Sequence, residues 1–189
     1  MKVYLAGPDV FLPDAAEIGR GKVGLCVRYG LTGLFPLDNE VDADASNPSL
    51  QIFRGNEALM NEADAIIANL TSFRGPSADA GTVYELGYMA GRSRLCLGYS
   101  NDPFLYADRV REFTKVTLGD GSLKDAQGLT VENFDLSDNL MIIHALDLHG
   151  CALVTPPQRP SDIWRDLTSF EICVRMAAAR LGVSQSGSG

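Results

Sequence analysis

The sequence is poor in the residues that most metal and redox chemistry requires. It contains two histidines, His144 and His149, and four cysteines that are far apart, with no Cys-x-x-Cys pair. Zinc sites and histidine-based triads are therefore poorly supplied. We expect reduced, mostly buried cysteines as in a cytosolic protein, and no metal site.

Positive charge and long apolar stretches are also scarce. The chain has 16 Lys and Arg against 24 Asp and Glu, a formal net charge of -8. Such a surface repels phosphate backbones, so we expect no nucleic-acid polymer as a partner, although nucleoside-sized ligands stay possible. No run approaches about 18 apolar residues, and MKVYLAGPDV is too short in apolar length for a signal peptide. We therefore expect a cytoplasmic protein without a membrane span.

What the chain does contain is a series of short apolar runs that alternate with helical patterns. Its 189 residues suit one domain, at 1–183, before a tail at 184–189 that we expect to be disordered. The alternation predicts an α/β fold, a single three-layer flavodoxin-like or Rossmann-like domain with about five parallel strands and helices on both faces. The expected strands are 3–6, 31–35, 64–70, 94–99 and 151–155. The expected helices are 13–30, 49–63, 81–92, 138–148 and 161–181, and 100–137 is expected to be loops with one short helix at 107–114.

Ligands bind such sheets at the carboxyl ends of the strands, where the segment GPSADAGTVYELGYM (75–89) is expected to lie. Thr82 and Glu85 match a capping box with Thr82 as the N-cap, and Asp79 would stabilise the positive end of the helix. The same pattern suits a catalytic pair. Glu85, in the first turn and kept ionised by the helix dipole, would act as a nucleophile, while Asp79 holds a hydroxyl or relays a proton. The local pattern leaves both interpretations open.

Five segments together resemble the nucleoside 2-deoxyribosyltransferase family. They are VYLAGP (3–8), FPLDN (35–39), IFRGNEALMNEADAIIANL (52–70), SFRGPSADAGTVYELGY (72–88) and DNLMI (138–142). The resemblance covers roughly residues 1–145. It implies transfer of 2-deoxyribose between nucleobases, with 2'-deoxynucleosides and free bases as partners and no cofactor. It also implies a homodimer or larger homo-oligomer with sites shared between subunits.

The resemblance assigns roles to particular residues. Glu85 corresponds to the family's nucleophile, which becomes covalently linked to deoxyribose. Asp79 corresponds to a carboxylate that contacts the nucleoside, and Tyr4 to a tyrosine that orients the nucleophile. Asn139 corresponds to an asparagine that reaches into the neighbouring subunit's site to hold the sugar, and Met141 in the same segment is a candidate substrate contact. Taken alone, Tyr4 would be a core aromatic residue and Asn139 a helix N-cap.

Five further residues are candidate substrate contacts. Gly7 ends the first strand segment, and Phe11 would stack on the base, or else be a core phenylalanine. Arg74 and Gly75 lie in a loop that would meet a 5'-oxygen or phosphate, although an exposed loop arginine is the simpler interpretation. Asn56 is a departure, since some family members have an aspartate there; an amide can bind a base edge but is not an acid at neutral pH.

Two other functions stay open. One is a hydrolase of the same superfamily that cleaves 2'-deoxynucleoside 5'-monophosphates, with a phosphate pocket in the loop 72–77. The other is a non-catalytic flavodoxin-like module that binds a nucleotide as a sensor.

Overall fold

Four parallel strands form the central sheet of the computed structural model, which describes residues 1–38 and 46–183. In spatial order they are β2 (Thr32–Leu34), β1 (Lys2–Ala6), β3 (Ala65–Asn69) and β4 (Leu95–Tyr99). In the register, Tyr4 of β1 lies opposite Leu34 on one side and Ile66 on the other. The two central strands are almost wholly buried, which explains their nearly continuous apolar sequences. The expected tail at 184–189 lies outside the described residues.

The prediction of a fifth strand at 151–155 is wrong. This segment runs parallel to β4 but forms only isolated bridges, at Gly150 and at Val154, with that strand. The amide of Val154 donates to the carbonyl of Gly98 at 3.0 Å, and its carbonyl accepts from the amide of Ser100 at 2.9 Å. Pro156 and the proline after it have no amide hydrogen, so the pairing cannot continue.

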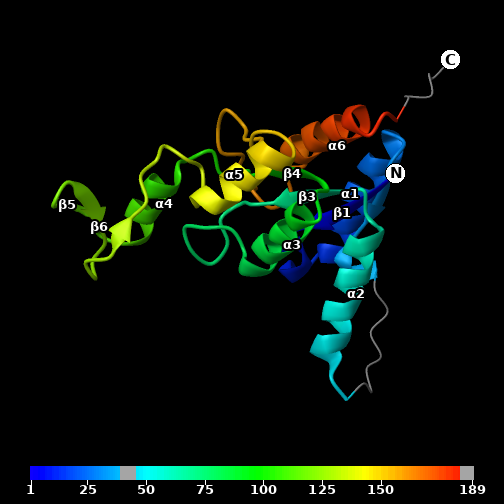
Figure 1. Ribbon diagram of the computed structural model, residues 1–189, viewed down its shortest axis with the longest axis horizontal. Coiled ribbons are helices and arrows are strands. Elements are labelled where there is room, and N and C mark those ends of the chain that lie inside the picture. The colour runs from blue at the N-terminus through cyan, green and yellow to red at the C-terminus, as the bar shows by residue number, and fades with distance from the viewer. Residues whose placement is uncertain (39–45, 184–189) are drawn as a thin grey trace.

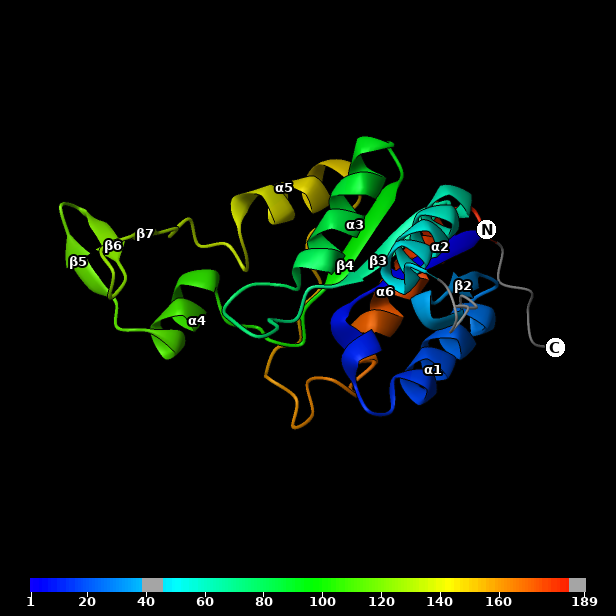
Figure 2. The ribbon, with the colours of Figure 1, turned by 90° about the horizontal axis from the view of Figure 1, so that it is seen from below.

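Helices cover both faces of the sheet, as Figures 1 and 2 show. On one face lie α1 (Ala15–Arg28) and α6 (Thr168–Arg180). On the other face lie α2 (Pro48–Glu62), α3 (Ala80–Gly91) and α5 (Leu140–His149). Successive side chains of β1 enter different cores: Leu5 packs with Phe170 on the first face, and Tyr4 packs with Leu86 on the second. The predicted three-layer α/β fold is confirmed.

Most of the expected helices are present, with one shifted start. The short helix predicted at 107–114 is α4 (Tyr106–Phe113). The last helix begins at Thr168 rather than 161, because the Asp162 carboxylate accepts from the amides of Trp164 and Arg165 and holds the chain in turns. Two short 3-10 helices, Pro8–Phe11 and Pro36–Asp38, were not predicted. No helix in the described ranges is both long and apolar enough to cross a bilayer.

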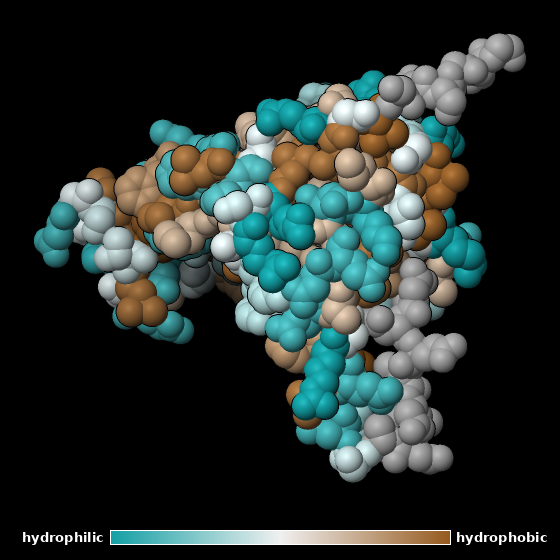
Figure 3. All heavy atoms as spheres, turned by 45° about the vertical axis from the view of Figure 1, so that its right-hand side comes forward, coloured by the Kyte–Doolittle hydropathy of each residue, from teal (hydrophilic) through white to brown (hydrophobic). Residues whose placement is uncertain are grey.

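Residues 106–135 form an arm that projects from the body (Figure 1) and holds structure that the sequence did not predict. After α4 come three short antiparallel strands, β5 (Thr117–Gly119), β6 (Ser122–Lys124) and β7 (Thr130–Val131). Between β5 and β6, Asp120 and Gly121 have φ of 50° and 76°, the positive values that a tight hairpin turn requires. Apolar side chains lie exposed on the arm, as Figure 3 shows, namely Phe113, Leu118, Leu129 and Phe134.

Candidate active site

Asp79, not Thr82, caps helix α3. Its Oδ2 accepts hydrogen bonds from the amide of Thr82 at 3.0 Å and from the Thr82 hydroxyl at 3.1 Å. The helix therefore begins at Ala80, and Glu85 lies in its second turn. The capping-box interpretation is wrong, and so is the expectation that Glu85 lies in the first turn. The expectation that Asp79 stabilises the start of the helix is confirmed.

Glu85 contacts Tyr4, as the family resemblance predicts. The hydroxyl of Tyr4 donates to Glu85 Oε1 at 2.6 Å, across 81 residues of sequence. The strand β1 holds Tyr4 completely buried, so the phenol has a fixed position. This hydrogen bond involves one of the two carboxylate oxygens of Glu85. Tyr4 is thus both a core residue and a partner of the candidate nucleophile.

Burial raises the pKa of Glu85 to about 7. The hydrogen bond from Tyr4 lowers this pKa, and the negative charge of Asp79 raises it. The pKa of Tyr4 is raised above its usual range, by burial first and then by the Glu85 carboxylate. The expectation that the helix dipole keeps Glu85 fully ionised is wrong, because the dipole acts within the first turn. Among the described residues, no cation pairs with Glu85. A carboxylate held near its pKa at neutral pH is typical of a catalytic position.

Gly7 lies where β1 ends, and its surroundings explain the need for glycine. A β-carbon at this position would collide with Asp9 Oδ2 and lie 2.7 Å from the β-carbon of Asn69. Asp9 also accepts from the ammonium of Lys22 at 2.5 Å and from the amide of Asn69 at 3.0 Å. Sequence analysis missed this buried network. The sequence did contain a sign of it. Asp9 follows the buried strand β1, and Asn69 is the last residue of the adjacent buried strand β3.

Phe11, Arg74 and Gly75 lie around the loops that follow β1 and β3. Phe11 is 56% exposed and stacks on Phe73, with ring centroids 5.4 Å apart and an interplanar angle of 12°. The alternative of a core phenylalanine is therefore wrong. The Arg74 guanidinium carbon lies 4.6 Å from the Phe73 centroid, and Arg74 has a φ of 54°. Gly75 has open space where a β-carbon would be, so packing within this chain does not require glycine there.

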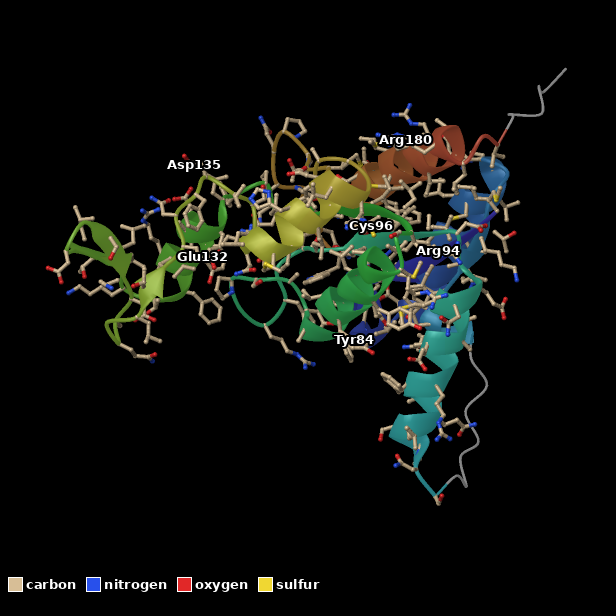
Figure 4. All side chains as sticks on the ribbon, viewed as in Figure 1. Tyr84, Arg94, Cys96, Glu132, Asp135 and Arg180 are labelled. Atoms are coloured by element: carbon tan, nitrogen blue, oxygen red, sulfur yellow. The ribbon has the colours of Figure 1, made fainter. Side chains whose placement is uncertain are left out.

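Asn56 lies on α2, the helix beside α3. One turn earlier, Phe53 contacts Tyr84 of α3 at a centroid distance of 6.1 Å. Tyr84 precedes Glu85 in the chain and lies on the side of α3 that faces α2 (Figure 4). Asn56 therefore belongs to the helix that packs next to the helix that carries Glu85.

Asn139 and Met141 lie at the start of α5. The Asn139 side chain accepts from the Met141 amide at 3.0 Å and donates to Glu132 Oε1 at 2.8 Å, where Glu132 is part of the arm (Figure 4). The N-cap alternative for Asn139 is confirmed. Both residues line an apolar groove of about 660 Å³ between α3 and α5, whose lining does not include Glu85. The groove thus places Asn139 and Met141 beside Leu86 and Gly87 of α3, and Glu85 is not part of its lining.

A buried ion pair, also missed by the sequence analysis, holds the loop that carries Asp79. Arg109 of α4 lies 3.2 Å from the Asp138 carboxylate and donates to the carbonyl of Pro76 at 2.7 Å. Asp138 also accepts from the amide of Ala78 at 3.1 Å. The start of α3 is therefore fixed to both α4 and α5. In residues 1–38 and 46–183, no group of three His, Cys, Asp or Glu side chains could hold a metal ion.

Comparisons with known proteins show the family to which this fold belongs. The sequence model of the family described as nucleoside 2-deoxyribosyltransferase matches residues 3–141. An uncharacterized protein of Schizosaccharomyces pombe is 34% identical over 155 residues, which cover 74% of each chain. The chain belongs to the nucleoside 2-deoxyribosyltransferase family.

Solved structures give the same result. A 2-desoxiribosyltransferase from Leishmania mexicana is 34% identical, with a TM-score of 0.58 over 75% of this chain and 84% of that one. A conserved protein from Enterococcus faecalis V583 is 21% identical, with a TM-score of 0.55 over 82% and 91% of the two chains. The second likeness supports the fold alone.

Proposed function

We propose that the protein transfers 2-deoxyribose between nucleobases through a covalent ester on Glu85. The observation that carries this proposal is the 2.6 Å hydrogen bond from Tyr4 to a Glu85 carboxylate whose pKa is raised to about 7. Family membership supports the class of reaction, and so does the name of the Leishmania neighbour. Partners are 2'-deoxynucleosides and free nucleobases.

In the first half-reaction, the ionised Glu85 attacks C1' of the nucleoside. The C1'–N bond breaks, its electron pair leaves with the base, and a new bond joins C1' to the carboxylate oxygen that Tyr4 does not contact. The departing base takes a proton from water, because the amide at Asn56 is no acid and Asp79 carries the negative charge that raises the pKa of Glu85. Positive charge that grows at C1' and the ring oxygen is stabilised by the carboxylate.

In the second half-reaction, a ring nitrogen of another base attacks C1'. That base gives its proton to the hydroxide left by the first half-reaction, the C1'–O ester bond breaks with its electron pair on the oxygen, and Glu85 regains its carboxylate. Two inversions at C1' give net retention of configuration. We infer a preference for deoxyribose, because a 2'-hydroxyl beside Glu85 would crowd and hydrogen-bond the nucleophile. Gly7, Phe11, Asn56 and Asn139 are the candidate contacts for the substrate, with Arg74 and Gly75 near its 5'-end and no cofactor required.

We also propose a homodimer or larger homo-oligomer in which Asn139 and Met141 complete the site of a neighbouring copy. Three features support this: the apolar groove between α3 and α5, the position of Met141 within it at 72% exposure, and the apolar side chains on the arm. Size-exclusion chromatography with light scattering measures the molar mass in solution and tests the proposal; a monomer at micromolar concentration would contradict it.

We further propose one domain over 1–183 and a cytoplasmic location. The four unpaired cysteines support the cytoplasmic location.

A second candidate function is hydrolysis of 2'-deoxynucleoside 5'-monophosphates. It is favoured by Arg74, which has no carboxylate partner among the described residues and has a φ of 54°, a strained value for arginine. Such a cation beside the site would suit a 5'-phosphate.

One assay separates these functions. The protein is incubated with deoxyinosine and adenine, and in parallel with deoxyinosine monophosphate, and the products are separated chromatographically. Deoxyadenosine indicates a transferase, and free base without transfer indicates a hydrolase. Binding of a nucleotide without turnover indicates a sensor. Glu85→Ala should abolish either reaction, while Glu17→Ala on the exposed side of α1 should not; turnover by Glu85→Ala at near-normal rate would contradict the assignment of the nucleophile.

A further inference from the structure

Residues 155–167 form a strap that passes the carboxyl ends of the strands before α6 begins. In Figure 2 the strap is the orange loop below these strand ends. It lies outside residues 3–141, which the family model matches, so its role is not carried over from the family. It nevertheless contacts the loops on which Phe11 and Phe73 are placed.

The strap is fastened to the end of β4 by polar contacts. Arg159 donates to the completely buried Asp102 at 2.9 Å. The side-chain amide of Asn101, also buried, donates to the carbonyls of Ile163 and Asp166 at 2.8 Å each. Two neighbouring residues of one strand end thus hold the strap at two places, which restricts its position over the sheet edge.

A second attachment, through Arg165, fixes the end of the strap that leads into α6. Arg165 makes a bidentate contact with Asp14, at the start of α1, at 2.7 Å and 2.8 Å. Asp162 accepts from the amide of Trp164 at 3.0 Å and sets the turn there. Trp164 therefore has a defined backbone position between two charged anchors.

Trp164 packs against the aromatic pair beside the candidate site. Its ring meets Phe73 edge-on, with centroids 5.9 Å apart at 89°, and Phe73 stacks on Phe11. Edge-to-face and offset-stacked rings are both favourable arrangements, so the three rings hold one another in place. The series ends in the exposed ring of Phe11, which follows the strand that carries Tyr4.

We propose that the strap is part of the nucleobase subsite, in which Trp164 positions Phe73 and Phe11 so that a purine or pyrimidine ring stacks on them. The inference rests on the proposed function for the identity of the ligand. Flat aromatic faces recognise a base, because every base presents a π-face for stacking. Trp164 is a positioning residue, since it acts through Phe73 and Phe11 rather than on the reacting atoms.

The chain's single tryptophan makes a direct test possible. Intrinsic emission of the full-length protein is followed while adenine, and separately deoxyinosine, is added. We expect a saturable change in Trp164 emission for both ligands, with a midpoint near the KM. In Phe11→Leu the midpoint should move to higher ligand concentration, because one of the stacked rings is lost.

Kinetics on variants of the strap provide a second readout. Trp164→Leu should raise the KM for both substrates roughly two- to tenfold, the range expected for one aromatic contact, with kcat within about twofold. Trp164→Phe keeps an aromatic edge and should restore most of the affinity. Gln158→Ala, an exposed change in the same strap, is the matched control and should leave KM unchanged. A lower melting temperature with unchanged KM in Trp164→Leu would overturn the proposal.

The two proposals fail in different ways. If the wild type catalyses neither transfer nor hydrolysis but Trp164 emission responds saturably to adenine, the proposed function is wrong and the base subsite stands. If turnover is normal and emission does not change at saturating substrate, the strap is not part of the subsite. The emission test needs no variant of Trp164, so it remains decisive even if Trp164→Leu does not fold.

Discussion

Two carboxylates lie near the carboxyl end of β1 and have opposite surroundings. Asp9, on the α1 side, is 1% exposed, and its two oxygens accept from the Lys22 ammonium and the Asn69 amide. Glu85, on the α3 side, accepts from the uncharged phenol of Tyr4, and its nearest charged influence is another carboxylate, Asp79. Among residues 1–38 and 46–183, Asp9 has a cationic partner and Glu85 has none.

We infer that Asp9 stabilises the fold on one face of β1, whereas Glu85 is available for reaction on the other face. Lys22 also lies over the rings of Tyr99 and Phe170, at 5.6 Å and 5.3 Å from their centroids, so its pair with Asp9 is enclosed by the core. With both oxygens engaged, Asp9 is a poor nucleophile. Glu85 has one oxygen outside its bond to Tyr4, and burial raises its pKa to about 7. We infer that the absence of a cation beside Glu85 is what makes this carboxylate available for attack.

The largest expected effect comes from breaking the Asp9 pair. Lys22→Met leaves a buried carboxylate without its cation, and we expect the free energy of unfolding to fall by about 3–5 kcal/mol. For a chain of this size the melting temperature should drop by roughly 10 °C, measured by circular dichroism. Lys2→Met is the matched control, because Lys2 pairs with Glu62 at 2.6 Å on the exposed surface. That change should cost less than about 1 kcal/mol, and equal losses in both variants would contradict the comparison.

The next largest expected effect is a gain in stability, from removing the charge of Glu85. The folded-state pKa of Glu85, about 7, lies above its ordinary value of 4.5. The stability from its protonated form is therefore fully present below pH 4.5 and is lost as pH rises through about 7. Glu85→Gln keeps an acceptor for Tyr4 and removes the charge. At pH 8 it should be more stable than the wild type, on the order of 1–3 kcal/mol, with little difference near pH 4.

Urea unfolding at the two pH values measures this change. Glu171→Gln is a suitable control, because the Glu171 carboxylate also accepts from a tyrosine, Tyr29, at 2.7 Å but has Arg28 beside it at 3.4 Å. This control should show no gain at pH 8. A Glu85→Gln variant that is less stable than the wild type at pH 8 would show that the ionised carboxylate is not strained by burial.

Local sequence patterns were sufficient for most of the fold. The central strands could be predicted because β1 and β3 are buried on both sides and read as apolar runs. The arm could not, since strands of two or three residues such as β7 are too short to show alternation. Only Asp120-Gly121 marked a hairpin there. The fifth strand was predicted in error because its composition suits a strand, while its hydrogen bonding ends at Val154.

For the candidate site, the sequence supplied candidate residues but not their electrostatics. The family resemblance proposed Glu85, Asp79 and Tyr4, and the structure shows the hydrogen bond from Tyr4 to Glu85, while the catalytic roles stay predictions. The local argument from the helix dipole gave the wrong ionisation state, because burial depends on tertiary packing that no short segment encodes. The pair of Lys22 and Asp9 was missed for the same reason, since a lysine in a helix is normally exposed.

A smaller effect is expected from Tyr4→Phe, which tests what sets the pKa of Glu85 while the fold is retained. The hydrogen bond from Tyr4 lowers the pKa of Glu85, so Tyr4→Phe should raise this pKa further. The proposed mechanism requires the Glu85 anion, so kcat/KM of the wild type should rise as pH increases through about 7. This limb of the profile should move to higher pH by roughly one unit in Tyr4→Phe. Tyr29→Phe removes a similar phenol–carboxylate bond at a distant position and should leave the profile unchanged. A limb that moves to lower pH would contradict the role of Tyr4.

The smallest expected effect is a lower pKa of Glu85, and it tests the influence of Asp79. Asp79→Asn keeps a side-chain oxygen to cap α3 through the Thr82 amide, so the helix should be retained. It removes the negative charge that raises the pKa of Glu85, and the acid limb should therefore move to lower pH by a few tenths of a unit, roughly. Asp64→Asn, at the opposite end of the sheet, is the control. Because Asp79 is also a candidate substrate contact, the midpoint of the limb and not the absolute rate is the informative quantity, and an unchanged midpoint would mean that burial alone sets the pKa of Glu85.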